Sequence, residues 1–133
     1  MAYKTWGTLN GAGDNAMVVC HAFSGTCDVG DWWAQLMGRG KVFDPSVFFI
    51  VCCNVLGSPY GSASPLTRNP ATGKPYGADF PVATVRDTVR LHKALLDALG
   101  VTVVQAVVGG TRTFPLVHAD WLSRRIARGH AGL

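Results

Sequence analysis

Residues 82–110, VATVRDTVRLHKALLDALGVTVVQAVVGG, decide the fold, because they join a helical pattern directly to a buried strand pattern. Apolar residues recur at helical spacing, and we predict one amphipathic helix over Val82–Leu99. Gly100 can stop this helix, since glycine adopts the left-handed conformation common after a helix end. The continuous apolar run Val101–Val108 is typical of a strand buried on both faces. A helix followed at once by such a strand indicates an α/β protein.

Three further strands are predicted upstream of this helix. Tyr3–Leu9 is aromatic and threonine-rich, Ala16–Cys20 is a short apolar run, and Val47–Cys53 has the strongest strand pattern of the chain. Asp31–Leu36 predicts one or two helical turns, with Asp31 as the cap. A helix between two of the strands predicts a right-handed crossover in a mostly parallel sheet.

The predicted helix carries its apolar side chains on one face. The start of this helix is expected at Thr84 or close to Pro81. The residues expected on the buried face are Val85, Val89, His92, Leu96 and Leu99, widened by Leu91 and Leu95. Residues 54–81, which precede the helix, are rich in Gly, Pro, Ser and Asn and hold no hydrophobic period. A loop of that length in a small domain is usually functional.

The composition excludes several classes of protein. Hydrophobic residues make up 48% and charged residues 15% of the 133 residues, which is too apolar for a disordered chain. The mean hydropathy is +0.20, and we expect further chain to cover some of this apolar surface. The net charge of +4 includes a cluster of Arg124, Arg125 and Arg128, but no basic stripe with interleaved aromatic residues indicates a nucleic-acid partner. No apolar run approaches the roughly 20 residues of a membrane span.

Cysteine usage predicts a reduced, cytoplasmic protein without a metal site. Cys20, Cys27, Cys52 and Cys53 have no C-x-x-C spacing, which argues against structural zinc. The adjacent pair Cys52-Cys53 cannot form a disulfide without strain. The polar segment Tyr3–Asn10 lies where a signal peptide would need apolar residues.

The pair Gly109-Gly110 ends the last predicted strand, at the place where an α/β-hydrolase carries its nucleophile. Enzymes of that fold have a G-x-S-x-G turn between a strand and a helix. The turn is tight, so small residues are required there on steric grounds. The nucleophile then stands exposed above the sheet, and the backbone N–H that follows it helps to bind the oxyanion.

Ordered segments along residues 2–110 resemble the homoserine O-acetyltransferase family of α/β-hydrolase-fold acyltransferases. The segments that carry the resemblance are Tyr3–Asn10, His21–Gly25, Trp32-Trp33, Gly38–Lys41, Phe43-Asp44, Asn54–Ser62, Asn69–Gly77, Asp79–Pro81, Arg86-Asp87, Leu95–Gly100 and Val107–Gly110. The most distinctive of them is Asn54–Ser62, which also fits deacetylcephalosporin C acetyltransferase of the same group. For residues 1–110 we therefore predict a partial α/β-hydrolase domain, with the N-terminal strands of the sheet and one main crossover helix.

The resemblance implies acetyl transfer from acetyl-CoA to the hydroxyl of homoserine, as part of methionine biosynthesis. Acetyl-CoA would be a co-substrate, and no bound cofactor is implied. By resemblance, the backbone N–H groups of Phe23 and Arg112 would form the oxyanion hole. Ser24 and Gly25 would line the substrate pocket, and Thr111 stands at the nucleophile position. Members of the family are often homodimers, so the implied partners are small-molecule substrates and a second copy of the chain.

The sequence departs from the family pattern after Gly110. The family continues with Ser-Met-Gly-Gly, whereas this chain reads Thr111-Arg112-Thr113, and the β-branched Thr113 is poorly suited to a tight turn. We therefore predict a divergent tail over residues 111–133 and a truncated chain without activity. A changed reading frame, a retained intron or an alternative exon would explain such a tail.

Alternatives remain open at the level of the residue and of the function. Thr111 is either the nucleophile or the first residue of an unrelated tail, and His21 either a base or a residue that shapes its loop. Trp32-Trp33 is expected to pack rather than to stack on an adenine, and His92 to lie at the core edge or the surface. The three candidate functions are a homoserine-type O-acetyltransferase, a non-catalytic truncated protein, and an esterase or other acyltransferase of this fold.

Overall fold

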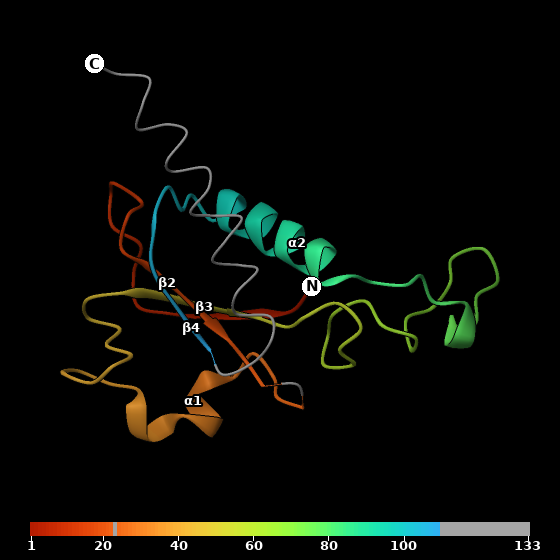
Figure 1. Ribbon diagram of the computed structural model, residues 1–133, viewed down its shortest axis with the longest axis horizontal. Helices are drawn as coiled ribbons and strands as arrows, with labels where there is room; N and C mark the ends of the chain where they lie inside the picture. The colour runs from red at the N-terminus through yellow and green to blue at the C-terminus, as the bar shows by residue number, and fades with distance from the viewer. Residues whose placement is uncertain (23, 110–133) are drawn as a thin grey trace, which may run out of the picture.

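A four-stranded sheet forms the centre of the structure, a computed structural model that describes residues 1–22 and 24–109. The strands lie in the order β1-β3-β2-β4. Their bounds are β1 Tyr3–Trp6, β2 Ala16–Cys20, β3 Phe49–Cys53 and β4 Val104–Gly109. Figure 1 shows the sheet, with β2, β3 and β4 labelled, between α2 (Val85–Ala98) and α1 (Val29–Trp32). β2 is parallel to both β3 and β4, whereas β1 runs antiparallel to β3. The predicted mostly parallel sheet is therefore present.

Three of the four strands are shorter than their sequence patterns predicted. At the start of β3, the N–H groups of Val47 and Phe48 both donate to the Asp44 carbonyl, at 3.1 and 2.9 Å, so these two residues form a turn. Ahead of β4, the N–H groups of Thr102 and Val103 both donate to the Gly13 carbonyl, at 2.8 and 3.1 Å. These residues have strand propensity, but their backbone groups are already bonded outside the sheet.

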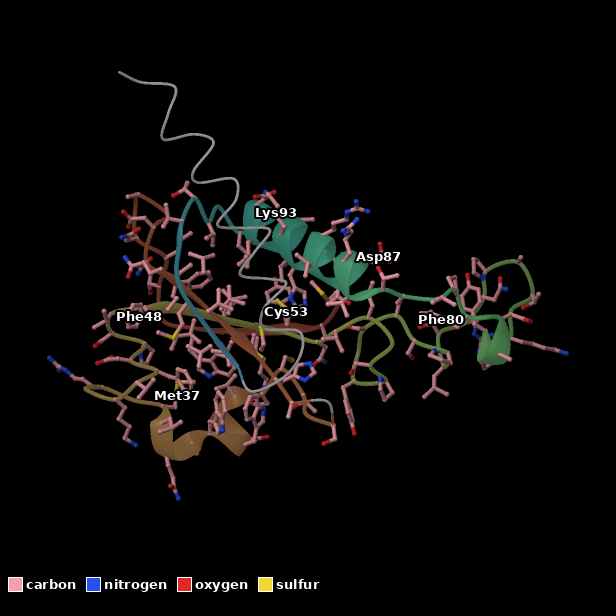
Figure 2. The ribbon with its side chains drawn as sticks, viewed as in Figure 1. Met37, Phe48, Cys53, Phe80, Asp87 and Lys93 are labelled. Atoms are coloured by element: carbon pink, nitrogen blue, oxygen red, sulfur yellow. The ribbon has the colours of Figure 1, made fainter. Side chains whose placement is uncertain are left out.

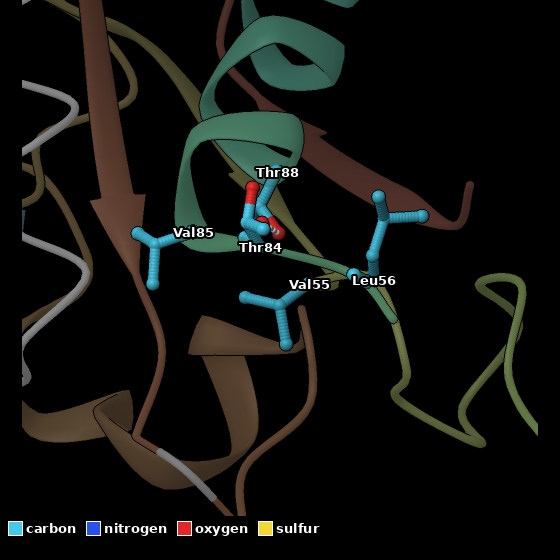
Figure 3. Close-up of a pocket in the computed structure, with 6 residues that line it drawn as sticks. Val55, Leu56, Thr84, Val85 and Thr88 are labelled. Atoms are coloured by element: carbon cyan, nitrogen blue, oxygen red, sulfur yellow. Dashed lines mark hydrogen bonds between the residues drawn. The ribbon is translucent and has the colours of Figure 1, made fainter. Parts of the chain in front are cut away.

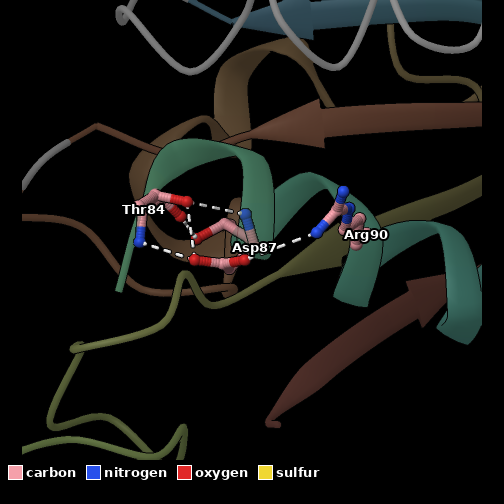
Figure 4. A network of polar contacts seen from close by, with 4 residues as sticks. Thr84, Asp87 and Arg90 are labelled. Carbon is pink, nitrogen blue, oxygen red and sulfur yellow. Dashed lines mark hydrogen bonds and ion pairs between the residues drawn. The ribbon is translucent and has the colours of Figure 1, made fainter. Parts of the chain in front are cut away.

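The crossover helix α2, Val85–Ala98, begins at a capping box. The Thr84 hydroxyl accepts from the Asp87 N–H at 3.2 Å, and the Asp87 carboxylate accepts from the Thr84 N–H at 3.0 Å (Figure 4). Together these bonds satisfy donors that a bare helix start would leave unpaired. The cap is therefore the predicted Thr84, and the first helical residue, Val85, lies three residues after the predicted start at Val82. Gly100 follows its end with a φ of +81°, as expected for a glycine stop.

Two hydrophobic clusters cover the two faces of the sheet, because successive strand residues point to opposite sides. The first cluster lies on the α2 side and includes Ala16, Val18, Cys20, Phe49, Val51, Cys53, Val89, Leu96 and Val101. The second lies on the side of α1 and includes Met17, Val19, Cys27, Val29, Phe43, Ile50 and Cys52. Figure 2 labels Cys53, which belongs to the first cluster, on the side of the sheet that faces α2.

The first helical segment differs from its prediction. It consists of α1, Val29–Trp32, followed by the 3₁₀ turn η1, Ala34–Leu36. Asp31 lies inside the first turn of α1 and does not cap it. Asp28 holds the capping position, but its side chain makes no capping bond and instead pairs with Lys4. The local sequence predicted the helix but placed its start too late.

The tryptophan pair next to α1 packs within the protein. The rings of Trp32 and Trp33 lie 4.5 Å apart between centroids, and Trp33 stacks on Phe43 at 5.4 Å. Both tryptophans pack against the second hydrophobic cluster. This packing agrees with the predicted structural role of the pair.

The segment between β3 and α2 extends away from the sheet, at the right of Figure 1. It contains mostly turns, one 3₁₀ helix, η2 Gly77–Asp79, and an isolated antiparallel bridge between Arg68 and Pro75. Tyr76 and Phe80 pack edge to face, with ring centroids 5.8 Å apart. The predicted long loop without hydrophobic periodicity is confirmed, and local turns give it its shape.

Candidate functional site

The candidate site lies where the carboxyl ends of β2, β3 and β4 meet, which we call the carboxyl edge. Cys20, the last residue of β2, is directly opposite Gly109, the last residue of β4. β3 ends next to β2 at Cys53. Open α/β sheets bind their ligands outside the carboxyl ends of parallel strands. The loop 21–25 after β2 and the loop 54–62 after β3 therefore hold the residues best placed to form a site.

His21 joins these two loops. Its side chain is 4% exposed, with Nδ1 2.7 Å from the Ala22 carbonyl oxygen and Nε2 3.4 Å from the Val55 N–H nitrogen. A backbone N–H can only donate, so Nε2 accepts and the ring proton resides on Nδ1, from which it is donated to Ala22. Both nitrogens thus face main-chain groups. This arrangement supports the loop-shaping role for His21 over that of a base.

The loop after β2 is tight at Gly25. The Gly25 N–H donates to the Ala22 carbonyl at 2.8 Å, and a Cβ at Gly25 would lie 3.2 Å from that oxygen. Ser24 is exposed beside this turn. Of the five predicted site residues, Ser24 and Gly25 are thus at the carboxyl edge. Phe23, Thr111 and Arg112 lie outside the described residues.

The loop after β3 is organised around Asn54, which the sequence analysis did not single out as a site residue. Asn54 is 1% exposed, and its side-chain amide donates to the Tyr60 carbonyl. The Ser62 hydroxyl donates to the Asn54 carbonyl at 3.1 Å, and the Gly57 N–H donates to the Ala63 carbonyl at 2.8 Å. An asparagine directly after a buried strand, followed by Gly and Ser, is a signal that could have identified this turn.

Gly109 is required by close packing at the end of β4. A Cβ there would lie 2.8 Å from the Cβ of Cys20 and 2.9 Å from the Cys20 carbonyl oxygen. Real Cβ atoms essentially never approach other atoms so closely. The prediction of a sterically restricted strand end therefore agrees with the structure.

His92 lies in the interior, which corrects the expectation of a core-edge or surface position. It is 3% exposed on α2. Burial lowers the pKa of the imidazole to about 4, and the nearby His21 lowers it further, while the backbone carbonyl of Asn54 partly opposes this effect. His92 is therefore neutral at physiological pH. The helical spacing predicted His92 on the buried face of α2. We expected a less buried position because the imidazole ring is polar.

The four cysteines are free and buried. Burial raises the thiol pKa to about 11 for Cys20 and about 12 for Cys53, and it raises that of Cys52 further. Cys20, Cys52 and Cys53 are thus protonated, apolar core residues rather than nucleophiles. Across residues 1–22 and 24–109, no group of three or more His, Cys, Asp or Glu side chains is arranged to hold a metal ion.

A shallow cleft opens beside the start of α2. It has a volume of about 150 Å³ and is lined by Val55, Leu56, Ala83, Thr84, Val85 and Thr88 (Figure 3). Its walls come from the loop after β3 and the first turn of the helix.

In the part of the chain that the structure describes, no helix combines the length and apolar character needed to cross a membrane.

Comparison with curated proteins identifies close relatives. The chain is 60% identical to the homoserine O-acetyltransferase of Saccharomyces cerevisiae over 111 residues, which are 84% of this chain and 23% of the relative. It is 57% identical to that of Salinibacter ruber over 111 residues, 84% of this chain and 32% of the relative. No protein-family model matches the sequence. The chain therefore spans less than a third of the length of these relatives.

A third relative extends the similarity. The homoserine O-acetyltransferase of Schizosaccharomyces pombe is 58% identical over 121 residues, which are 91% of this chain and 24% of the relative. A match of 121 residues does not fit within residues 1–110, so this similarity continues into the segment after Gly110.

Comparison with solved structures confirms the fold. Esterase E22 superposes with a TM-score of 0.77 and 36% identity, covering 91% of this chain and 37% of the esterase. Homoserine O-acetyltransferase from Bacillus anthracis superposes with a TM-score of 0.74 and 33% identity, covering 90% of this chain and 36% of that protein. The predicted partial α/β-hydrolase fold is therefore confirmed, and the fold is shared by acetyltransferases and esterases.

Proposed function

We propose that this chain forms the first part of an acetyltransferase catalytic domain. The premise is its homology to homoserine O-acetyltransferases over 84% of its length. The activity belongs to the whole catalytic domain, of which the chain corresponds to about a quarter. The chain would supply one wall of the acyl pocket and part of the oxyanion hole of that domain. The reaction would be acetyl transfer from acetyl-CoA to the hydroxyl of homoserine or a related acceptor.

The observation that carries this proposal is the joint organisation of the two loops at the carboxyl edge. His21 bridges the loop after β2 to Val55, and Asn54 holds the loop after β3. Both loops belong to segments that resemble the family. Catalysis requires donors held in advance at the position where charge develops, because reorientation during the reaction would cost free energy. A bridge between the loops provides such rigidity.

In the reaction proposed for the whole domain, the hydroxyl of the family's serine, whose position Thr111 holds in this chain, attacks the thioester carbonyl of acetyl-CoA. The C–S bond breaks, CoA leaves as the thiol, and the acetyl group is held as an ester on the enzyme. The homoserine hydroxyl then attacks this ester and restores the enzyme hydroxyl. The backbone N–H groups of Phe23 and Arg112 would stabilise the oxyanion in both steps, and the loss of one such donor costs about 3 kcal/mol.

Residues Ser24 and Gly25 are proposed to line the acyl pocket next to Phe23. The exposed Ser24 and the tight turn at Gly25 support this role. We further propose a cytoplasmic protein that acts on small-molecule substrates, with homodimers formed by the whole protein.

The test is a chimera in which residues 2–110 of this chain replace the corresponding segment of the Saccharomyces cerevisiae relative. The chimera should release CoA from acetyl-CoA when L-homoserine is present. The matched control carries Gly25→Val, which would crowd the pocket and should reduce kcat/KM at least tenfold. A chimera that unfolds as cooperatively as the parent enzyme but releases no CoA would contradict the proposal.

The 133-residue chain by itself is expected to be inactive, because Thr111 replaces the family's serine and the β-branched Thr113 suits the tight turn poorly. Purified chain, given acetyl-CoA and L-homoserine, should release no more CoA than a heat-denatured sample. Release above that level would overturn this expectation and assign Thr111 as a working nucleophile.

A second candidate function is hydrolysis of acetate esters. It is favoured by the 36% identity and the TM-score of 0.77 with esterase E22. The same chimera separates the two functions, because an esterase would hydrolyse a simple acetate ester in preference to acetyl-CoA. Preference for acetyl-CoA with L-homoserine as acceptor would support the acetyltransferase.

A further inference from the structure

Two buried polar side chains below the carboxyl edge have hydrogen-bonding atoms without a partner among the described residues. These atoms are Oδ1 of Asn54 and both ring nitrogens of His92. Asn54 is 1% exposed and His92 is 3% exposed. Buried polar groups in native proteins almost always have a partner, and an unsatisfied one is costly. The main-chain carbonyl of Asn54 lies close enough to the His92 ring to act on it as a hydrogen-bond acceptor, so it can serve one ring nitrogen. Asn54 Oδ1 and the other His92 nitrogen then still need a polar partner, which indicates a polar ligand between the two elements.

The orientation of Asn54 is fixed by its other bonds. Its side-chain nitrogen donates to the Tyr60 carbonyl, so rotating the amide by 180° would bring two oxygens together. Oδ1 must therefore remain on the opposite side of the amide group. The main-chain carbonyl of Asn54 accepts from the Ser62 hydroxyl at 3.1 Å, which anchors the residue at a second point.

His92 approaches Asn54 from α2. The Asn54 carbonyl and the His21 ring are near enough to influence the His92 imidazole. His21 has its own partners on both nitrogens, at Ala22 and Val55. It is therefore not free to satisfy His92.

Space for a small ligand adjoins these groups. The cleft of about 150 Å³ is lined by Val55, which follows Asn54, and by Thr88, which lies one helical turn before His92. A water molecule occupies about 30 Å³ in the liquid and needs two to four polar partners when buried. Asn54 and His92 do not line the cleft themselves, but each is next to a lining residue on its own element, so a water molecule that enters the cleft is close to both.

We propose that Asn54 and His92 bind one internal water molecule, which links α2 to the loop after β3. The water would donate one hydrogen to Asn54 Oδ1. A neutral imidazole has one N–H donor and one acceptor nitrogen, so His92 can donate to the water oxygen or accept its second hydrogen. This site goes beyond the proposed acetyltransferase function and does not depend on it.

The first test is a high-resolution crystal structure of the 133-residue chain. We expect one ordered water within about 3 Å of both Asn54 Oδ1 and a His92 ring nitrogen. A direct hydrogen bond between the two side chains, or another part of the chain occupying the space, would overturn the proposal.

The second test compares amide hydrogen exchange at Gly57 and Ser58 in three variants. His92→Leu removes both ring nitrogens and should accelerate exchange about tenfold, because the loop loses its link to the helix. His92→Gln retains a donor and an acceptor and should remain within about twofold of the wild type. Val89→Ala is the matched control, since it removes buried apolar packing from the same helix.

The contrast between the variants decides the outcome. Faster exchange in His92→Leu than in Val89→Ala, with His92→Gln close to the wild type, supports the water link. Equal acceleration in His92→Leu and Val89→Ala would mean that His92 acts only through packing, and the proposal would fail.

Discussion

Gly109 at the end of β4 faces Cys20 at the end of β2 so closely that any side chain at position 109 would collide with the β2 backbone. The Cβ of an alanine would lie 2.8 Å from the Cys20 Cβ and 2.9 Å from its carbonyl oxygen. The two residues are opposite one another in the parallel register. This contact sets the spacing of the strands where the candidate site begins.

Gly109→Ala should destabilise the protein by about 2 kcal/mol, because overpacking a closely packed position forces the backbone to shift. Urea unfolding followed by circular dichroism would measure the change. Gly11→Ala is the control, since no atom lies within 4 Å of a Cβ at that position. Equal stability of the two variants would argue against the close contact.

Thr84→Ala should reduce stability by about 1 kcal/mol, because it removes the hydroxyl that accepts from the Asp87 N–H. Thr84→Ser retains a hydroxyl and should recover most of the loss. Thermal unfolding of the three proteins would measure this effect. Similar melting temperatures for the alanine and serine variants would show that the capping bond contributes nothing.

The stability of the protein should fall as the pH is lowered from about 6.5 towards 4. Burial lowers the His92 pKa from 6.5 to about 4, so in this range the unfolded chain binds a proton at His92 that the native protein does not. Stability from this group is therefore complete above pH 6.5 and is lost on acidification, by about 2–3 kcal/mol.

His92→Gln has no titrating group at this position and should lose less stability over the same range. Urea unfolding at pH 7.0, 5.5 and 4.5 would measure both proteins. Hydrogen bonds from Thr84 lower the Asp87 pKa, and hydrogen bonds from Ser46 and Gly40 lower the Asp44 pKa. The stability that these two carboxylates contribute is therefore lost only below about pH 4, outside the range of the His92 effect. Parallel pH profiles for wild type and variant would exclude a buried, neutral His92.

The four thiols should react slowly with Ellman's reagent in the native protein and all four at once in denaturant. All four side chains are buried, and burial raises the pKa of the Cys20, Cys52 and Cys53 thiols. The reactive thiolate is therefore both scarce and shielded. Rapid reaction of two or more thiols in the native protein would contradict the buried core.

Local sequence patterns predicted the elements that depend on nearby residues. Helix α2 and its Thr84 cap follow from helical spacing and a capping box, and β2 follows from a short apolar run. The ends of β3 and β4 could not be predicted in this way. Asp44 and Gly13 accept the hydrogen bonds of the residues just before these strands, and both partners are set by the three-dimensional arrangement.

All five predicted site residues remain predictions. Resemblance pointed to Ser24 and Gly25, which lie at the carboxyl edge in the structure, whereas Phe23, Thr111 and Arg112 lie outside the described residues. The sequence did not indicate how Asn54 anchors the loop after β3. That role depends on hydrogen bonds to Tyr60 and Ser62, which form only when the turn has folded.

The sequence by itself determined the α/β class, the order of the elements and the glycine at the strand end, because periodicity and turn chemistry act over a few residues. Only the tertiary structure decided the strand order, the bridge from His21 to Val55, and the burial of His92 against Asn54. These features join residues that are far apart in the chain, such as the 34 positions between His21 and Val55. Such pairs meet only after the sheet has assembled, so no local pattern encodes them.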